Sequence, residues 1–294
     1  MHNYLRAIGI SDCKSKSDVC KYIEVILQNP DATQMAEDED GVVFVQFYKR
    51  FTENMGLMVC GEMAPDDTFH MEYYYPCFEG SCVSTKEDVL VEKHFDREAY
   101  AGICEDVRLG VSLIFFIQNV SEYKNELRLK RLSKLGSTVT LSGLSTSGTV
   151  LLPIKKSEEQ RRRDSAKSNK RCQLLAAAKR GDEAAMESLT IEDIDIYTMV
   201  SRRILQEDIF TLVDTFFMPY GVECERYSVL GEIIELSEVK NSVTGEPIYS
   251  MVIRCNDIEF DVCIHKADLL GEPQIGRRFK GVIWLQGKIN FFEK

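Results

Sequence analysis

The chain has 294 residues, enough for two domains, or three small ones, with buried cores. Its composition, 44% hydrophobic and 28% charged, is that of a globular protein and excludes a disordered or fibrous chain. Asp and Glu outnumber Lys and Arg by 47 to 36. The resulting formal charge of −11 disfavours binding of nucleic acid or of an anionic membrane over the whole surface.

The first residues lack the cationic start, apolar run and small-residue cleavage site of a signal peptide. The most apolar stretch, residues 109–120, is interrupted by Gly110, Ser112 and Gln118, whereas a transmembrane helix needs roughly 20 apolar residues. The ten cysteines have no tight repeated spacing, so we expect reduced thiols that pack as small hydrophobic side chains. These features predict a cytoplasmic protein without a membrane-spanning segment.

The first half of the chain predicts a helix followed by strands. Apolar residues at helical spacing follow Ser17, a candidate cap, and Pro30 ends the run. Alternating apolar residues and turn residues then predict strands at 42–47, 55–63, 69–76, 89–93 and 107–118. On the third of these, Phe69 and Tyr75 are expected to share one face. This order predicts an α+β domain in which the helix covers an antiparallel sheet.

The charge pattern reverses in the middle of the chain. Residues 121–180 hold 15 Lys or Arg against 5 Asp or Glu, a net charge of +10 that leaves −21 on the other residues. Within this region, STVTLSGLSTSGTVLLPI predicts a hairpin, and KKSEEQRRRDSAKSNKR predicts a solvated helix or a linker. Residues 172–217 then have helical periodicity. A first domain boundary is expected near Pro153.

The C-terminal part predicts a small β-barrel. Strands are expected at 228–236, 248–255, 258–264, 279–286 and 288–292, with tight turns at Thr244-Gly245 and Asn256-Asp257. A short helix, 266–270, follows the third strand, which is the order of an OB-type barrel. The expected organisation is an α+β domain over 1–153, a basic linker and helical segment over 154–220, and an OB-like barrel over 221–294.

A metal site was sought among His, Cys and acidic residues. His70 and Glu72 share a strand face and could ligate a metal, and Cys77 and Cys82 form a second weak candidate pair. No third ligand follows at a recognised spacing, so exposed polar positions and packed thiols are the simpler interpretation. The sequence therefore predicts neither a metal nor a cofactor, and a cryptic enzyme or metalloprotein centred on the N-terminal sheet is kept as an alternative.

Basic residues provide a candidate surface for nucleic acid or nucleotides. The central ones are Arg161, Arg162, Arg163, Lys167, Lys170 and Arg171. On the predicted barrel, Arg277, Arg278 and Lys280 lie near Trp284, and Lys280, Trp284 and Gln286 are expected to share a face that could stack bases. Against this, residues from Gly221 onward hold 9 basic and 12 acidic side chains, and the central run has no interleaved aromatic residues.

No phosphate loop, dinucleotide fingerprint or nucleophile elbow is present, so no catalytic residue is assigned. The absence of a catalytic signature and the internal charge asymmetry favour a non-enzymatic cytosolic binding or regulatory protein that acts through protein contacts. Nucleic-acid or nucleotide binding, through the central basic segment and the barrel, is the first alternative.

The segments FTENMGLMVCGE, YAGICEDVRLGVSLIFFIQN, AAAKRGDEAAMESLTIEDID, FFMPYGVECERYSVLGEI and DLLGEPQIGRRFKGVIWLQGKINF together resemble an uncharacterised bacterial protein family of about this length. That family is catalogued as a domain of unknown function, and the resemblance covers nearly the whole chain. It implies a cytosolic bacterial protein and carries no activity, cofactor or residue role.

Overall fold

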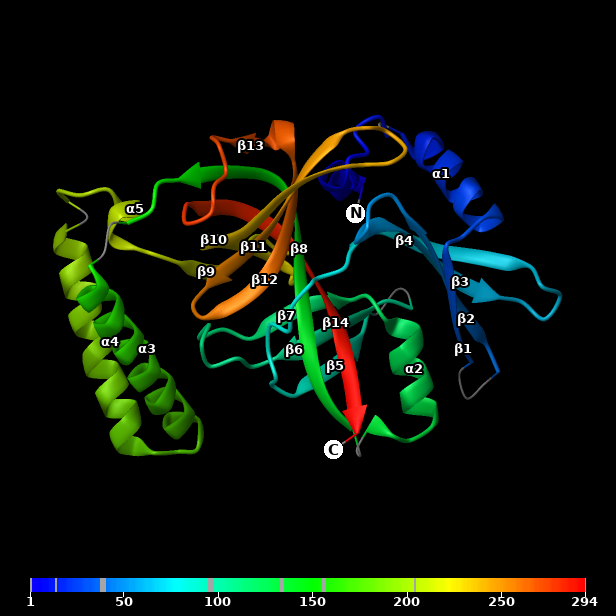
Figure 1. The fold of residues 1–294 in the computed structure, drawn as a ribbon. Helices are drawn as coiled ribbons and strands as arrows, with labels where there is room; N and C mark the ends of the chain where they lie inside the picture. The colour runs from blue at the N-terminus through cyan, green and yellow to red at the C-terminus, as the bar shows by residue number, and fades with distance from the viewer. Residues whose placement is uncertain are drawn as a thin grey trace.

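The computed structural model describes residues 2–13, 15–37, 41–94, 98–132, 135–154, 157–203 and 205–293. Over these residues the protein has an α+β fold with five α-helices, a four-stranded antiparallel sheet and a ten-stranded mixed sheet (Figure 1). The expected fold class is confirmed at this level. None of the described helices is both long enough and apolar enough to span a membrane.

The N-terminal part places a helix on a small sheet. A 3-10 helix, η1 (His2–Ile8), precedes α1 (Lys16–Gln28), and β1 (Ala32–Glu37), β2 (Val43–Arg50), β3 (Met55–Met63) and β4 (Phe69–Phe78) pair in chain order. Helix α1 buries Val19 and Ile26 and contacts β2 and β3, as its spacing predicts. Its cap is Ser15 rather than Ser17, because Ser15 and Asp18 form a reciprocal capping box.

Strand β4 departs from simple alternation at a β-bulge. The pairing with β3 shifts between Cys60 and Gly61, which leaves Glu72 without a directly paired residue. Beyond the bulge, Tyr73 and Tyr75 are buried, whereas Met71 is exposed. The expectation that Phe69 and Tyr75 share one face is therefore wrong. The extra residue in β4 moves the side chains that follow it to the opposite face of the sheet.

The second sheet begins with a three-stranded meander and a helix. These are β5 (Val89–Lys93), β6 (Tyr100–Cys104), β7 (Leu113–Ile117) and α2 (Val120–Arg128). The other main strands are β8 (Leu135–Leu151), β10 (Arg226–Lys240), β11 (Pro247–Cys255), β12 (Ile258–His265) and β14 (Arg278–Glu293). Short elements complete it: β9 (Phe216–Pro219) pairs with β10, and η3 (Lys266–Asp268) leads into β13 (Leu269–Leu270), which pairs with β8.

Five of these strands are hydrogen-bonded in a closed circuit. Strand β8 pairs with β14 on one side and in parallel with β12 on the other, and β12, β11, β10 and β14 pair antiparallel in that order. Two expectations are corrected here. Residues 279–286 and 288–292 belong to one strand, and the sequence expected to form a hairpin after Ser137 is the single strand β8, which supplies the fifth member of the circuit.

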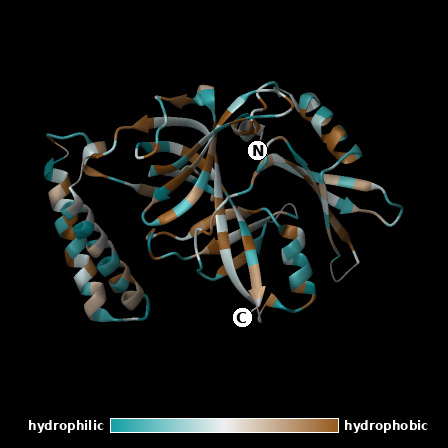
Figure 2. Ribbon diagram, viewed as in Figure 1, coloured by the Kyte–Doolittle hydropathy of each residue, from teal (hydrophilic) through white to brown (hydrophobic). Residues whose placement is uncertain are grey.

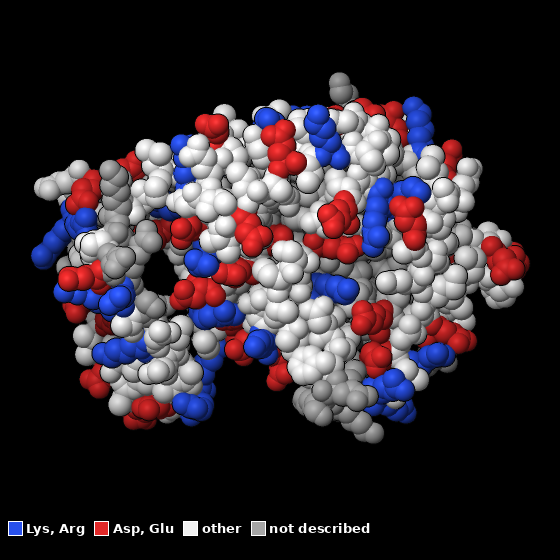
Figure 3. All heavy atoms as spheres, in the orientation of Figure 1, with Lys and Arg blue, Asp and Glu red and all other residues white. Residues whose placement is uncertain are grey.

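The middle of the chain is a helical hairpin that projects from the body. It consists of α3 (Glu158–Lys179) and α4 (Glu183–Arg203), and the short α5 (Ile209–Leu212) leads the chain back (Figure 1). In Figure 3 an open gap separates much of the hairpin from the body. Figure 2 shows hydrophobic residues on α4 as well as on the strands of the body.

Arg278 holds the two ends of this insertion together. Its guanidinium is buried and donates hydrogen bonds to the carbonyl oxygens of Leu152 at 3.0 Å, Val213 at 3.0 Å and Phe210 at 2.8 Å. Leu152 follows β8 and Val213 follows α5, so residues 153–212 leave the body and return to it at adjacent points. The boundary expected near Pro153 stays a prediction.

Aromatic side chains join the two sheets in one core. Phe116 of β7 packs against Tyr75 of β4 at 4.7 Å between ring centroids and against Trp284 of β14 at 5.2 Å. Tyr4 of η1 covers Trp284 at 5.3 Å. The four-stranded sheet is therefore packed against the closed circuit of strands rather than separate from it.

Candidate functional site

A cavity of about 180 Å³ lies where the four-stranded sheet meets the rest of the protein. Its lining residues come from β1, β2, β3, β4, the segments after β4 and β7, and β14: Ala32, Gln34, Gln46, Tyr48, Arg50, Met58, Cys77, Glu79, Gln118, Asn119 and Lys288. Alternate residues of β2 reach it because side chains two apart on a strand point to the same face. The floor of the cavity is thus one face of the sheet.

Tyr48 occupies the floor in a confined position. Its ring lies beside Gly56 of β3, where an added Cβ atom would come within 2.6 Å of the ring and 2.1 Å of the Lys49 carbonyl oxygen. The tyrosine is only 4% exposed, and its hydroxyl lies beside the Glu79 carboxylate without a hydrogen bond of normal geometry among the described residues. Burial, with Cys77 and Glu79 nearby, raises the pKa of Tyr48 far above its ordinary value, so the phenol stays protonated.

Buried amides form the wall behind Tyr48. Gln118 Nε2 donates to the Phe78 carbonyl oxygen at 2.7 Å and to Gln286 Oε1 at 2.9 Å, and Gln286 Nε2 donates to the Pro76 carbonyl oxygen at 2.7 Å. Gln46 Nε2 in turn donates to the Gln118 carbonyl oxygen at 3.0 Å. Because these amides bond to each other and to the backbone across both sheets, they fix the wall in place.

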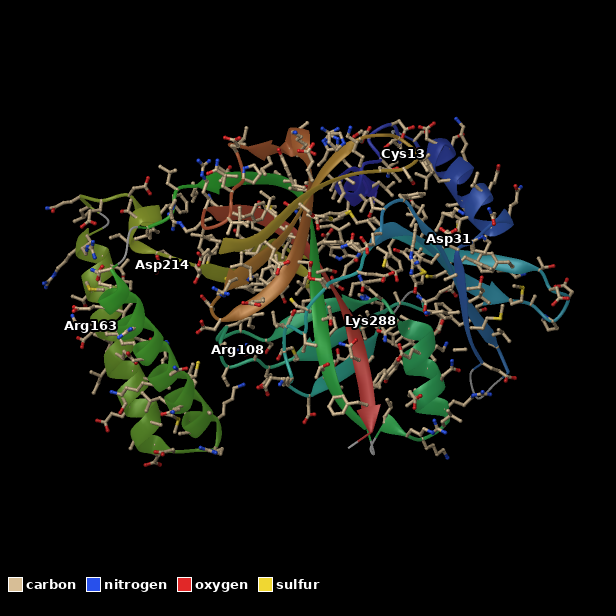
Figure 4. All side chains as sticks on the ribbon, viewed as in Figure 1. Cys13, Asp31, Arg108, Arg163, Asp214 and Lys288 are labelled. Atoms are coloured by element: carbon tan, nitrogen blue, oxygen red, sulfur yellow. The ribbon has the colours of Figure 1, made fainter. Side chains whose placement is uncertain are left out.

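Three charged side chains line the cavity. Arg50 lies with its guanidinium carbon 5.8 Å from the centre of the Tyr48 ring, and Glu79 is close enough to affect the pKa of both Tyr48 and Cys77. Lys288 lies between β14 and the four-stranded sheet (Figure 4) and also affects the pKa of Cys77. Within the described ranges none of these three groups forms an ion pair. The cavity therefore offers two cations, one carboxylate and a phenol to a ligand.

The weak metal candidates lie on β4 and in the segment that follows it. His70 is exposed and lies across from Glu62, whereas Glu72 accepts a hydrogen bond from the Glu98 backbone N–H at 3.0 Å. Burial raises the pKa of the Cys77 thiol well above its ordinary value.

Cys82 lies in the segment after β4, and burial and acidic neighbours raise its pKa to about 11. A thiol must lose its proton to bind a metal, so these shifts disfavour ligation. No cluster of three metal-ligating side chains occurs in the part of the chain that the structure describes.

The central basic residues lie along α3. The side chains of Arg162, Arg163, Lys167 and Lys170 are exposed, whereas the side chain of Arg161 lies outside the described residues. Arg171 differs from these because its guanidinium binds Asp193 of α4 at 2.7 Å and lies 3.6 Å from Glu192. Part of the positive charge of α3 is thus used within the hairpin.

The basic residues near Trp284 do not form one exposed face. The pairing of β14 with β10 is regular from Arg278 to Trp284, so Lys280 and Trp284 lie on one face of the strand. Trp284 is nevertheless 6% exposed and Gln286 is fully buried, because Tyr4 and Phe116 pack against Trp284 and Gln118 donates to Gln286. The Lys280 ammonium lies 4.4 Å from the centre of the Phe210 ring. Arg277, the neighbour of the buried Arg278, donates to the Glu272 carbonyl oxygen at 2.7 Å.

Apart from Cys77, a weak metal candidate, the sequence analysis did not single out the lining residues of the cavity as candidate site residues. Gln46 interrupts the apolar run of residues 43–47, and a polar residue among buried positions is the one signal that could have identified it. Tyr48 and Arg50 follow on the same face. Glu79, Gln118 and Lys288 come from distant parts of the chain, and their proximity depends on how the two sheets pack.

Helix α4 exposes large apolar side chains on its outer side. Met186, Ile191, Ile194 and Tyr197 are 44%, 55%, 59% and 75% exposed, while Ala185 and Leu189 on the same helix are buried. A surface helix normally has one apolar face, which packs on a neighbour. On α4, large apolar side chains also stay exposed outside the contact with α3.

Comparison with known proteins gives one match. The family model described as "Domain of unknown function, E. rectale Gene description (DUF3881)" covers residues 5–287, which confirms the resemblance to such a family. No curated protein and no solved structure matches the chain. The match brings no assigned activity, so the function is unknown at this level. On the extent of the match, nearly the full chain, the protein belongs to the DUF3881 family.

Proposed function

We propose that the protein is a non-enzymatic binding or regulatory protein that acts through protein contacts, with the α3–α4 hairpin as its contact element. The exposed apolar side of α4 carries this proposal, because Ile191, Ile194 and Tyr197 are each more than half exposed. Burying a large apolar side chain contributes about 1.5 to 3 kcal/mol, so several together are a strong driving force for association.

The occupant we propose for this surface is a second copy of the chain. The N-terminal part of α4 is acidic, with Glu183 and Glu187, and its last turn is basic, with Arg202 and Arg203. If two copies of α4 pack antiparallel, each acidic end lies beside the basic end of the other copy. A two-fold symmetric contact of this kind is self-complementary in charge at its two ends, and it brings the exposed isoleucines of both copies together.

We infer that the closed circuit of strands is an OB-type barrel with a permuted strand order. The meander β10–β11–β12, the short helix η3 after it and then β14 follow the first four strands of that fold, and β8 occupies the place of the fifth although it comes first in the chain. The hairpin is inserted where this permutation connects β8 to β10.

This interpretation supports a protein partner over nucleic acid at the barrel. OB barrels bind oligonucleotides on the face of their second and third strands, which correspond here to β11 and β12. On β12, Asp261 and Cys263 are buried, and the Ser81 backbone N–H donates to Asp261 Oδ2 at 2.7 Å. The segment after β4 therefore covers part of the face that a nucleic acid would need.

The exposed basic side chains of α3 favour nucleic-acid binding as a second candidate function. Reversing the charges of Arg162 and Arg163 would then abolish binding to short oligonucleotides, and the affinity would fall steeply with salt. Fluorescence anisotropy at low and physiological salt tests this. Absence of binding at low salt would remove the candidate.

We also propose that the protein works in the cytoplasm. All ten cysteines are free thiols, and five of them are buried as small apolar side chains. A reducing compartment keeps such thiols unpaired.

The proposed contact is tested by sedimentation velocity of the full chain and of the variant Ile194→Glu. The wild type should sediment as a dimer and the variant as a monomer, because a carboxylate at the centre of the interface is desolvated without a partner. Ile275→Glu, at an isoleucine that is 69% exposed on the body, is the matched control and should remain dimeric.

Charge reversal gives a second, orientation-specific arm of this test. Arg202→Glu should weaken the dimer, and combining it with Glu183→Lys should restore the dimer if the two helices are antiparallel. A wild type that is monomeric at all concentrations, or a dimer that Ile194→Glu leaves unchanged, would refute the proposal.

A further inference from the structure

The hydroxyl of Tyr48 is the feature of the cavity that most needs a partner. It is buried beside the Glu79 carboxylate, and it makes no hydrogen bond of normal geometry among the described residues, although buried polar groups in proteins are nearly always paired. The ring cannot easily turn away, because it lies against the backbone at Gly56. A ligand that accepts or donates a hydrogen bond at this point would remove the cost of leaving the hydroxyl unpaired.

The charges around Tyr48 indicate what such a ligand carries. The cations of Arg50 and Lys288 suit a carboxylate, and the carboxylate of Glu79 suits an ammonium group. The amides of Gln46 and Gln118 are already hydrogen-bonded within the protein, so they contribute shape rather than free donors. Two cations and one anion, all without ion pairs among the described residues, match a molecule with charges of both signs.

The volume of the cavity limits the size of the ligand. About 180 Å³ is only slightly more than the roughly 150 Å³ cavity that holds one benzene molecule in another protein. Only part of a nucleotide or of a peptide fits inside this volume. A free amino acid with a small or medium apolar side chain has the required size.

We propose that this cavity binds a free α-amino acid, with its carboxylate at Arg50 and Lys288, its ammonium group at Glu79 and a hydrogen bond to the hydroxyl of Tyr48. Met58 of the floor and Ala32 of β1 provide the apolar surface for its side chain. This site is independent of the surface on α4, because its residues come from the opposite part of the molecule. Its test therefore does not depend on whether the protein forms a dimer.

The experiment is a thermal-shift screen of the full chain with the proteinogenic amino acids at millimolar concentration, followed by calorimetric titration of the best binder. That amino acid is then compared with the two molecules that lack one charge, which for L-valine are isovalerate and isobutylamine. The amino acid should bind at least about tenfold more tightly than either, which corresponds to about 1.4 kcal/mol.

Variants of the lining residues separate this site from a simple anion site. Tyr48→Phe should weaken amino-acid binding about tenfold while leaving the melting temperature of the ligand-free protein unchanged or higher, because it removes an unpartnered hydroxyl. Glu79→Gln should remove the preference for the amino acid over its carboxylate analogue. Glu53→Gln, an exposed residue that does not line the cavity, is the matched control and should change neither.

Three outcomes would overturn the proposal. The first is a folded wild type that no amino acid stabilises or binds. The second is a carboxylate analogue that binds as tightly as the amino acid, which would identify an anion site. The third is a Tyr48→Phe variant that is less stable without ligand but binds as the wild type does, which would show that the hydroxyl has a structural partner instead.

Discussion

Two buried aspartates, Asp106 and Asp261, have pKa values shifted in opposite directions. Burial by itself would raise the pKa of Asp106, but hydrogen bonds from Arg108 and from Thr85, at 2.7 Å for the latter, outweigh it and lower the pKa below its ordinary value. No cation among the described residues offsets the burial of Asp261, so burial dominates and raises its pKa even though Ser81 donates to it. Both side chains fix loops, yet only Asp106 favours the folded state as an anion.

This contrast predicts opposite pH effects for Asp106→Asn and Asp261→Asn. Asp106 has a lowered folded pKa, so its stabilisation is present above the unfolded pKa of about 3.9 and is lost as the pH falls through the folded pKa. Asp106→Asn should therefore cost about 2 to 3 kcal/mol at neutral pH and progressively less towards acid.

Asp261 has a raised folded pKa, so ionising it makes the folded state less stable as the pH rises above about 4. Asp261→Asn should accordingly gain stability relative to the wild type with rising pH. Urea unfolding of both variants between about pH 3 and pH 7 measures the two trends. If the free energy of unfolding of both variants changed with pH in the same way as that of the wild type, the inferred difference between the two carboxyl groups would be wrong.

Arg278 provides a second prediction at the residue scale. Its guanidinium donates to carbonyl oxygens on both sides of the inserted hairpin, and burial lowers its pKa. Arg278→Met should lower the free energy of unfolding by about 3 kcal/mol and increase amide exchange in residues 213–219. Arg277→Met, which loses one exposed hydrogen bond, should have little effect. Equal losses of unfolding free energy in the two variants would contradict the role of Arg278 in holding the two ends of the insertion together.

Glycines in long strands explain why some elements were predicted correctly from the sequence and others were divided in two. Helix α1 and the strands β10 to β12 follow from local patterns, and the turn at Asn256-Asp257 is confirmed by positive φ angles of 49° and 62°. Gly287, however, lies inside β14, where an added Cβ atom would come within 2.4 Å of the Phe115 ring. Gly287 thus marks the place where β14 and the Phe115 ring of β7 approach closely. From the sequence alone, such a glycine cannot be distinguished from one that ends a strand.

The same explanation applies to β8. Gly143 and Gly148 were interpreted as turn residues, but they lie within one strand, where an added Cβ atom would come within 2.8 Å of Ile283 and 2.5 Å of Phe279. The partners of both glycines are more than 100 residues away in the chain. A single sequence contains no local signal for such contacts, so the closed circuit of strands could not be predicted in this form.

The helical hairpin is expected to be dispensable for the fold of the body. Because Leu152 and Val213 both lie within hydrogen-bond distance of Arg278, a short Gly–Ser linker can replace residues 155–208 without strain. The shortened chain should keep the near-ultraviolet circular dichroism of its buried Trp284 and melt cooperatively. It should also be monomeric. A shortened chain that fails to fold would show that the hairpin belongs to the core.

At the scale of the whole molecule, charge asymmetry was the sequence feature closest to the proposed contact element. The net +10 of residues 121–180 includes the basic residues of α3, while Figure 3 shows acidic and basic side chains mixed on both the hairpin and the body. The apolar surface of α4 was missed because its residues fit an ordinary core stripe. Only the exposed position of the hairpin shows that no other part of the described chain covers it.

The candidate cavity could not be predicted from the sequence either. Its floor comes from one sheet, but Gln118 and Lys288 reach it from segments about 70 and 240 residues beyond β2. Their position depends on the packing of Phe116 and Trp284 between the two sheets. Residue patterns along a strand identify the floor of such a site, and only the assembled molecule identifies its walls.

The measurement that tests the account most directly is the mass of the full chain in solution by sedimentation equilibrium over a wide concentration range. The α4 contact predicts a reversible dimer of twice the 33.6 kDa chain mass, which Ile194→Glu converts to a folded monomer that melts at the temperature of the dissociated wild type. A single 33.6 kDa species at every concentration would contradict the account, as would a dimer that the variant leaves intact.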